Sequence, residues 1–270
     1  MNTDLTLLRL GCAALLTSLL GATPTRAEAS VSLKDCRISD ASGIRSITAR
    51  CGTLTVPENY AEPDGRQIDL FVAVVPALSQ KPAATPFTAI AGGPGAASTE
   101  FYAAYAGAFS RIQRNHDIIL IDQRGTGGSN KLDCVSELEP DLNREIDLEL
   151  IRNETETCLA GLDGDPRFYT TSIAMGDYNL VRQAMGYDKI NIMGVSYGSR
   201  AAQVYLRQFP ETVRSVTLDS VVPMQLALGQ EHAVMLDRSV QNVIEDCAGN
   251  ETCNSLYPHQ AEELNALFAR

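Results

Sequence analysis

The stretch KINIMGVSYGSR at residues 189–200 places a short apolar run directly before a serine that lies between two glycines. Residues 189–195 predict a buried strand, and residues 197–209 predict a helix that ends before a proline. Gly-x-Ser-x-Gly between a strand and a helix is typical of a tight turn that lifts the serine hydroxyl above the sheet. We therefore interpret Ser196 as a candidate nucleophile, placed where the helix dipole favours developing negative charge.

Strands and helices alternate around this stretch. Short runs rich in apolar or β-branched residues predict strands at 87–90, 117–121, 189–195 and 213–218, and two extended runs at 52–57 and 68–75 predict a strand pair at one sheet edge. Helical patterns lie between them at 99–114, 142–159, 173–185 and 197–209. The alternation predicts an α/β fold with a mostly parallel sheet and helices on both faces.

The two ends of the chain differ from this alternating region. Residues 1–29 contain an apolar run too short to span a bilayer, followed by a small-x-small pattern before Ser30, and predict a signal peptide rather than a buried helix. Beyond residue 223, helical patterns at 226–248 and 259–269 follow without a strand between them. We expect residues 30–222 to form the N-terminal part of the core, and residues 223–270 to begin a helical cap over the sheet.

Six cysteines remain once the predicted signal peptide is set aside, and an even number fits an exported, oxidised protein. Roughly fifteen pairings are possible, but nearness in sequence favours Cys36 with Cys51, Cys134 with Cys158 and Cys247 with Cys253. Zinc is the competing interpretation, and the ligand spacing it requires does not occur. We expect a secreted or periplasmic bacterial protein with no membrane anchor after removal of the signal peptide.

Charge and loop composition exclude several partners. The 270 residues carry a formal net charge of −11, which disfavours nucleic acid as a partner. The loop DQRGTGGS at 122–129 has neither the Gly-Lys-Ser/Thr ending of a phosphate-binding loop nor a dinucleotide-binding fingerprint, so we expect no cofactor and no metal. We interpret it as support for the rim of the site, with Asp122 and Arg124 as a possible ion pair.

The loop AGGPG at 91–95 follows the predicted strand 87–90, where a serine hydrolase would complete its oxyanion hole. Glycines let the backbone approach a reacting carbonyl closely, whereas Pro94 has no amide hydrogen to donate. We therefore predict that the amides of Gly93 and Tyr197 bind the oxyanion. An ordinary tight turn is the alternative interpretation of this loop.

The three motifs, in this order and spacing, resemble the α/β-hydrolase fold serine exopeptidases that include the prolyl aminopeptidases and the secreted bacterial tripeptidyl aminopeptidases. The resemblance covers residues 51–223 and includes the stretch LDSVVP at 218–223. It implies that peptides are cleaved from a free N-terminus through an acyl-enzyme at Ser196. Many prolyl aminopeptidases carry histidine at the position of Ala91, so strict proline specificity is not implied.

The acid and base of the catalytic triad follow the serine in this fold, on strands well downstream. His232 and His259 lie in cap-like helical sequence and are interpreted as surface or packing residues, while Asp219 is an acid only in a variant arrangement. We expect the acid and base beyond Arg270, and the chain as given to be nearly inactive. Carboxylates that could recognise an N-terminal ammonium are Glu231, Asp237 and Glu245, although a solvated helix face is the simpler interpretation.

Two other functions remain open from the sequence. A secreted esterase or lipase would use the same elbow and oxyanion loop. A catalytically dead hydrolase kept as a binding protein is the alternative from a different class, and the intact Ser196 with its glycine loops weighs against it.

Overall fold

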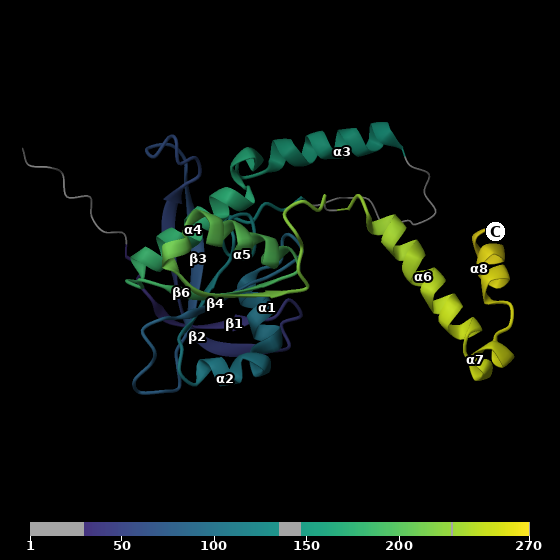
Figure 1. Ribbon diagram of the computed structural model, residues 1–270. Helices are drawn as coiled ribbons and strands as arrows, with labels where there is room; N and C mark the ends of the chain where they lie inside the picture. The colour runs from purple at the N-terminus through teal and green to yellow at the C-terminus, as the bar shows by residue number, and fades with distance from the viewer. Residues whose placement is uncertain (1–29, 135–146, 228, 270) are drawn as a thin grey trace, which may run out of the picture.

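The computed structural model describes residues 30–134, 147–227 and 229–269. At its centre is a seven-stranded sheet with the strand order β1-β2-β3-β5-β4-β6-β7 (Figure 1). The strands are β1 (Lys34–Ser39), β2 (Ser46–Pro57), β3 (Gln67–Val75), β4 (Phe87–Ile90), β5 (Ile118–Ile121), β6 (Ile190–Val195) and β7 (Val213–Asp219). Every predicted strand is confirmed to within a few residues, except that the extended run at 52–57 begins earlier.

The strand directions bring the predicted motifs to one edge of the sheet. β4 pairs in parallel with both β5 and β6, and β6 pairs in parallel with β7. β1, β2 and β3 are joined by antiparallel pairing, and β3 pairs antiparallel with β5. Because β4, β5 and β6 point the same way, the loops that follow them meet at their shared carboxyl edge.

β1 was not predicted from the sequence. Its six residues, KDCRIS, are mostly exposed, and only Ile38 is buried. A strand of this kind lacks the apolar run or clean alternation that reveals buried strands. It lies outside β2, so the predicted strand pair β2–β3 is next to the sheet edge rather than at it.

Helices cover both faces of the sheet, as predicted. α4 (Thr171–Ala184) and α5 (Tyr197–Gln208) lie on one face, and α1 (Ser98–Tyr105) and α2 (Ser110–Gln113) lie on the other (Figure 1). Side chains alternate along each strand and supply both cores. In β5, Ile119 and Ile121 join the core under α4 and α5, whereas Ile118 and Leu120 join the core under α1.

Two predicted helices have different bounds in the structure. The helix expected at 99–114 is interrupted by a 3-10 turn at Ala106–Phe109, where a glycine weakens helix propensity and Phe109 packs against neighbouring aromatic rings. The helix expected from residue 226 begins only at His232, because Gly229 has φ +91°, which an α-helix cannot contain. α3 (Leu148–Gly161) confirms part of the helix expected at 142–159, and residues 142–146 lie outside the described residues.

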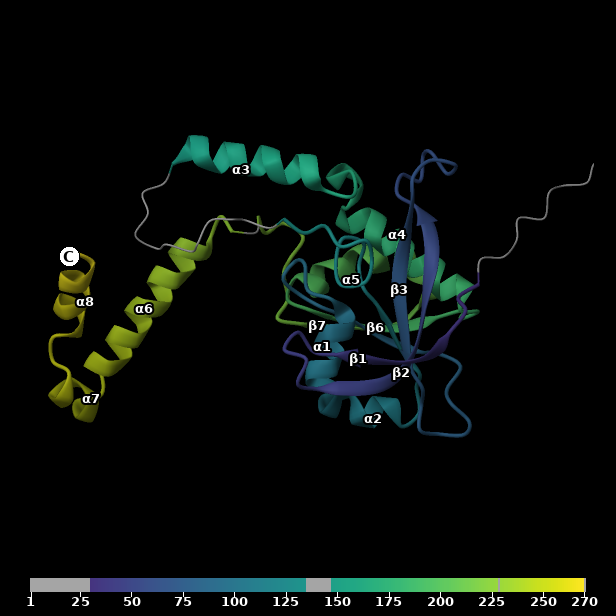
Figure 2. The ribbon, with the colours of Figure 1, turned by 180° about the vertical axis from the view of Figure 1, so that it is seen from behind.

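The C-terminal helices lie to one side of the sheet. α6 (His232–Ala248), α7 (Glu251–Leu256) and α8 (Gln260–Phe268) extend away from the sheet in both views (Figures 1 and 2). The short helix α7 was not predicted, and it begins after Asn250, whose side chain caps the amide of Cys253. The role of these helices as a cap remains a prediction.

All three predicted disulfides are present: Cys36–Cys51, Cys134–Cys158 and Cys247–Cys253. The first links β1 to β2, and the last links α6 to α7. The predicted signal peptide at residues 1–29 lies outside the described residues. Within the part of the chain that the structure describes, no helix is long and apolar enough to cross a membrane.

Candidate active site

Ser196 occupies a strained turn between β6 and α5, with φ +55° and ψ −123°. A β-carbon added at Gly194 would lie 2.1 Å from the carbonyl oxygen of Gly198, and one added at Gly198 would lie 2.1 Å from that of Ile90. Both distances are far below van der Waals contact, so each position accepts only glycine. The geometry is that of the elbow predicted from the sequence, and strained backbone of this kind clusters at functional sites.

Backbone hydrogen bonds hold the elbow against the end of β7. The amide of Ser196 donates to the carbonyl of Asp219 over 2.9 Å. The hydroxyl of Ser199 donates to the carbonyl of Ser196 over 2.6 Å and accepts from the amide of Val222 over 2.8 Å. Ser199 therefore connects the elbow to the segment after β7, a role that could have been suspected only from its place directly after the motif.

The same segment is also bound to α5. The guanidinium of Arg200 donates to the carbonyl of Pro223 over 2.7 Å and to the carbonyl of Leu226. The carboxamide of Gln203 donates to the carbonyl of Val222 over 3.1 Å. Residues 222–226, which lead toward α6, are thus fixed to the helix that begins at the candidate nucleophile.

The AGGPG loop lies against Ser196, as predicted. A β-carbon added at Gly92 would be 3.0 Å from the β-carbon of Ser196 and 3.5 Å from its hydroxyl oxygen. Gly92, which the sequence did not single out, is therefore the glycine that makes room for the serine. Gly93 follows it with φ +105°, a conformation that favours glycine. The oxyanion-binding roles of Gly93 and Tyr197 remain predictions.

The hydroxyl of Ser196 has no hydrogen-bond partner among residues 30–134, 147–227 and 229–269. His232 begins α6 and His259 precedes α8, and both side chains are exposed. The Nδ1 of His259 lies 3.3 Å from the Oε2 of Glu262. The carboxylate of Asp219 is exposed and accepts from the hydroxyl of Ser220 over 3.1 Å. No described residue is thus placed as the base of Ser196.

The three carboxylates considered for ammonium recognition, Glu231, Asp237 and Glu245, are exposed on α6 or directly before it. They lie on helices that extend away from the sheet (Figures 1 and 2). Their position fits the simpler interpretation, a solvated helix face.

The DQRGTGGS loop supports the site, but the proposed ion pair within it is wrong. The carboxylate of Asp122 accepts from the amide and hydroxyl of Thr99, both at 3.0 Å, and from the amide of Gly128 at 3.1 Å. The chain turns after Asp122, where the amide of Thr126 donates to the carbonyl of Gln123 over 2.9 Å. Because of this turn, the side chains of Asp122 and Arg124 contact different partners. Burial raises the pKa of Asp122.

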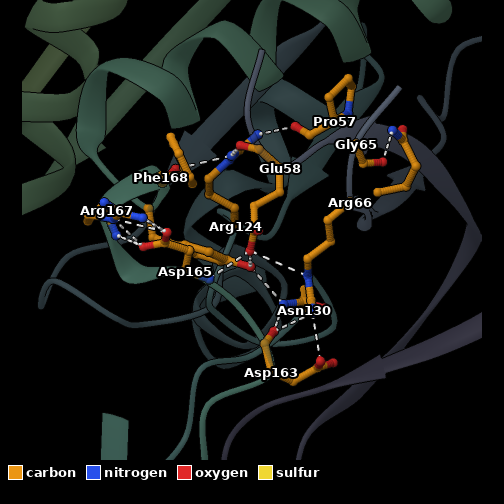
Figure 3. A network of polar contacts seen from close by, with 12 residues as sticks. Pro57, Glu58, Gly65, Arg66, Arg124, Asn130, Asp163, Asp165, Arg167 and Phe168 are labelled. Atoms are coloured by element: carbon orange, nitrogen blue, oxygen red, sulfur yellow. Dashed lines mark hydrogen bonds and ion pairs between the residues drawn. The ribbon is translucent and has the colours of Figure 1, made fainter. Parts of the chain in front are cut away.

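Arg124 binds Asp177 of α4 instead. Its Nε and Nη2 donate to the two carboxylate oxygens of Asp177, each over 2.7 Å, in a bidentate pair that is buried on both sides. Its Nη1 donates to the carbonyls of Glu58 at 2.7 Å and Phe168 at 3.1 Å (Figure 3). The hydroxyl of Tyr60 also donates to Asp177, and burial, together with the charge of Asp177, raises the pKa of Tyr60 far above its usual value.

A second polar cluster joins the β2–β3 hairpin to the loop before α4 (Figure 3). The buried carboxylate of Glu58 accepts from the amide of Asp165 over 2.9 Å and from the hydroxyl of Tyr169 over 3.1 Å. The Nε of Arg66 lies 3.5 Å from the Oε1 of Glu58. Burial and the hydrogen bond to Glu58 raise the pKa of Tyr169 to about 12. This cluster, which fixes the ring of Tyr169, was not predicted from the sequence.

A cavity of about 310 Å³ opens at the carboxyl ends of β4, β5 and β6. It is lined by residues of the AGGPG loop, the DQRGTGGS loop, α4 with the residues before it, and the start of α5: Pro94, Gly95, Gln123, Arg124, Gly125, Thr126, Leu132, Tyr169, Thr170, Ala174 and Tyr197. Tyr197 follows the candidate nucleophile directly, and its hydroxyl is hydrogen-bonded to that of Thr171 over 2.6 Å. The cavity therefore lies beside the elbow.

Residues 86–264 match the family model described as alpha/beta hydrolase fold, and the chain belongs to this family. Among curated relatives, it is 30% identical over 191 residues to a tripeptidyl aminopeptidase of Streptomyces coelicolor, covering 64% of this chain and 35% of that protein. It is 30% identical over 229 residues to the serine protease Hip1 of Mycobacterium tuberculosis, covering 76% of this chain and 42% of that protein.

The chain is also similar to an esterase and to a solved peptidase structure. A carboxylesterase B of Mycobacterium tuberculosis is 32% identical over 247 residues, covering 82% of this chain and 46% of that protein. The crystal structure of a proline iminopeptidase from Mycobacterium smegmatis is 16% identical with a TM-score of 0.44, covering 79% of this chain and 55% of that one. The chain spans less than half the length of these curated relatives.

Proposed function

We propose that this protein is a secreted serine hydrolase that releases residues or short peptides from free N-termini through an acyl-enzyme at Ser196. The observation that carries the proposal is the elbow. Gly194 and Gly198 have no room for a side chain there, and Ser196 lies between them in a strained turn, next to Gly92 of the AGGPG loop. The curated relatives named as a tripeptidyl aminopeptidase and a serine protease support a peptide substrate. The three disulfides support an oxidising compartment.

In the proposed reaction, the oxygen of Ser196 attacks the carbonyl carbon of the scissile peptide bond, while a base takes the hydroxyl proton. The amides of Gly93 and Tyr197 would bind the oxyanion of the tetrahedral intermediate. Collapse of the intermediate breaks the carbon–nitrogen bond, and the amine leaves with the proton returned by the base. Water then attacks the acyl-enzyme in the same way and restores Ser196.

The acid and base belong, in this proposal, to a C-terminal segment beyond Arg270. Two observations support it: the hydroxyl of Ser196 has no partner in the described parts of the chain, and the curated relatives are more than twice as long as the matched region. We expect residues 30–270 alone to be nearly inactive, because loss of triad members costs about a millionfold in rate in a well-studied serine protease. The intact mass of the native protein tests this point, and a mass equal to that of residues 30–270 would contradict it.

The experiment that tests the function compares two substrates with the native protein and with one variant. A tripeptide anilide with a free N-terminus should be hydrolysed, its N-acetylated form should be hydrolysed far more slowly, and Ser196→Ala should abolish the activity. Equal rates on the free and acetylated anilides would remove the requirement for a free N-terminus. A complete lack of hydrolysis by the native protein would favour the binding-protein alternative.

An esterase is the second candidate function, and the carboxylesterase B relative favours it. It would use the same serine and the same loops, because ester and peptide hydrolysis share the acyl-enzyme route. A p-nitrophenyl ester is the discriminating substrate. Rapid hydrolysis of this ester, with no cleavage of the peptide anilides, would identify the esterase.

A further inference from the structure

Gln123 is a buried polar residue whose side chain has no hydrogen-bond partner among the described residues. It is 5% exposed and lines the cavity beside the elbow. Its side-chain carboxamide forms no hydrogen bond with any residue in the described ranges. Its backbone carbonyl, in contrast, accepts from the amide and hydroxyl of Thr126. The side-chain nitrogen and oxygen of Gln123 are not among the fully buried atoms that lack a partner, so they remain accessible to solvent. An accessible carboxamide without a protein partner, in the wall of a cavity, is free to hydrogen-bond a ligand there.

The other cavity residues indicate an uncharged ligand. The one charged side chain in the lining, Arg124, already donates its hydrogen bonds to Asp177 and to backbone carbonyls. Much of the remaining wall is apolar or aromatic: Pro94, Leu132, Tyr169, Ala174 and Tyr197. Gln123 is thus the buried polar side chain in this wall that is free to select a ligand.

The position and size of the cavity connect it to the reaction. Pro94 and Gly95 belong to the loop whose Gly92 contacts Ser196, and Tyr197 is the next residue in the chain after Ser196. A volume of about 310 Å³ lies at the lower end of the range for small-molecule sites. A carboxamide both donates and accepts, which matches the carbonyl and N–H of one peptide group.

We propose that this cavity is the subsite for the acyl part of a peptide substrate, and that Gln123 hydrogen-bonds a peptide group on the N-terminal side of the scissile bond. The inference rests on the proposed function and deepens it. A single aminoacyl group has no such peptide group, whereas a dipeptidyl or tripeptidyl group has one. The subsite therefore favours the release of short peptides over the release of single residues.

The test measures binding to the full-length protein carrying Ser196→Ala, which removes the nucleophile and leaves the cavity lining intact. Alanyl-alanyl-alaninamide and alaninamide are the two probes, titrated by calorimetry. We expect the tripeptide amide to bind more tightly, and Gln123→Leu to weaken its binding about tenfold while leaving alaninamide unchanged. Gln80→Leu, an exposed glutamine in the loop between β3 and β4, is the matched control and should change neither.

A second variant separates a peptide group from an ammonium in the cavity. Gln123→Glu can accept but not donate at neutral pH, so it should weaken the tripeptide amide as Gln123→Leu does. Tighter binding to Gln123→Glu would place the substrate's ammonium there and overturn the proposal. The proposal is also overturned if Gln123→Leu binds the tripeptide amide as tightly as its parent, or if the parent does not bind it.

The outcomes distinguish this subsite from the proposed function. Hydrolysis that depends on Ser196, with unchanged binding in Gln123→Leu, would reject the subsite and keep the function. Binding that depends on Gln123, without hydrolysis by the native protein, would reject the function and keep a peptide-binding cavity. Thermal unfolding of each variant establishes that it is folded before binding is compared.

Discussion

The sheet around the elbow and the helices α6–α8 are built in opposite ways. At the elbow, Gly194 and Gly198 have no room for one methyl group, and Ile90 and Ile192 in the adjoining strands are buried. On α6 and α8, Leu236, Val243 and Leu267 are each more than 60% exposed. Tight packing therefore sets the geometry of the serine, whereas α6–α8 depend on local helix bonds and the Cys247–Cys253 disulfide.

The largest expected effect is that of Gly198→Ala. The added methyl group would meet two backbone carbonyls, those of Ile90 at 2.1 Å and Ala91 at 2.7 Å, which cannot move without breaking the sheet. We expect a loss above about 4 kcal/mol in the free energy of unfolding, measured by urea denaturation. Gly176→Ala in α4, where the site is open, should instead stabilise by about 0.5–1 kcal/mol.

Asp177→Asn should come next, because it leaves the guanidinium of Arg124 buried without its counter-charge. We expect a loss of about 3–5 kcal/mol in the free energy of unfolding. Arg167→Met, which removes a pair with Asp165 at the surface, is the control and should leave the unfolding midpoint unchanged. Equal midpoints for Asp177→Asn and the parent would show that the buried pair does not stabilise the fold.

A pair of matched truncations sharpens the contrast between the two regions. Ile192→Ala in β6 should cost about 2–5 kcal/mol, because the side chain is 1% exposed in the core. Leu236→Ala in α6, which is 67% exposed, should change stability by less than about 0.5 kcal/mol. A large loss in Leu236→Ala would mean that this face of α6 is packed in solution, and that the two regions do not differ in packing as described.

The smallest expected effect concerns pH. Burial raises the pKa of Asp122 above its ordinary value of 3.8, so the folded protein takes up this proton at a higher pH than the unfolded chain does. The contribution of Asp122 to stability is therefore greatest below pH 3.8 and falls as the pH rises through the folded pKa. Asp122→Asn should remove this slope in urea denaturation measured from pH 3 to pH 7, and an unchanged slope would contradict the assignment.

Local patterns were enough to predict much of the fold. The runs that form β4, β5 and β6 are short, apolar and followed by glycine-rich turns, which is why both their bounds and the place of Ser196 could be expected. β1 escaped prediction because its exposed, polar residues carry no apolar signal. The late start of α6 also escaped, because the positive φ of Gly229 is a property of the folded backbone.

The polar contacts of the site could not be predicted, because they join residues far apart in the chain. Arg124 pairs with Asp177, 53 positions away, rather than with its near neighbour Asp122. Glu58 accepts from Tyr169, 111 positions away, and no spacing rule reaches that far. The cavity that Gln123 lines depends on long-range contacts in the same way, since it requires the AGGPG loop, the DQRGTGGS loop, α4 with the residues before it, and the start of α5 to meet.

The most direct test of the central claim is labelling of the native full-length protein with a fluorophosphonate, followed by peptide mapping. An activated serine at an elbow reacts with such a reagent, whereas ordinary surface serines do not. We expect one adduct, on Ser196, which disappears in Ser196→Ala and after heat denaturation. An adduct on a different serine, or no adduct on the folded native protein, would contradict the assignment of Ser196 as the nucleophile.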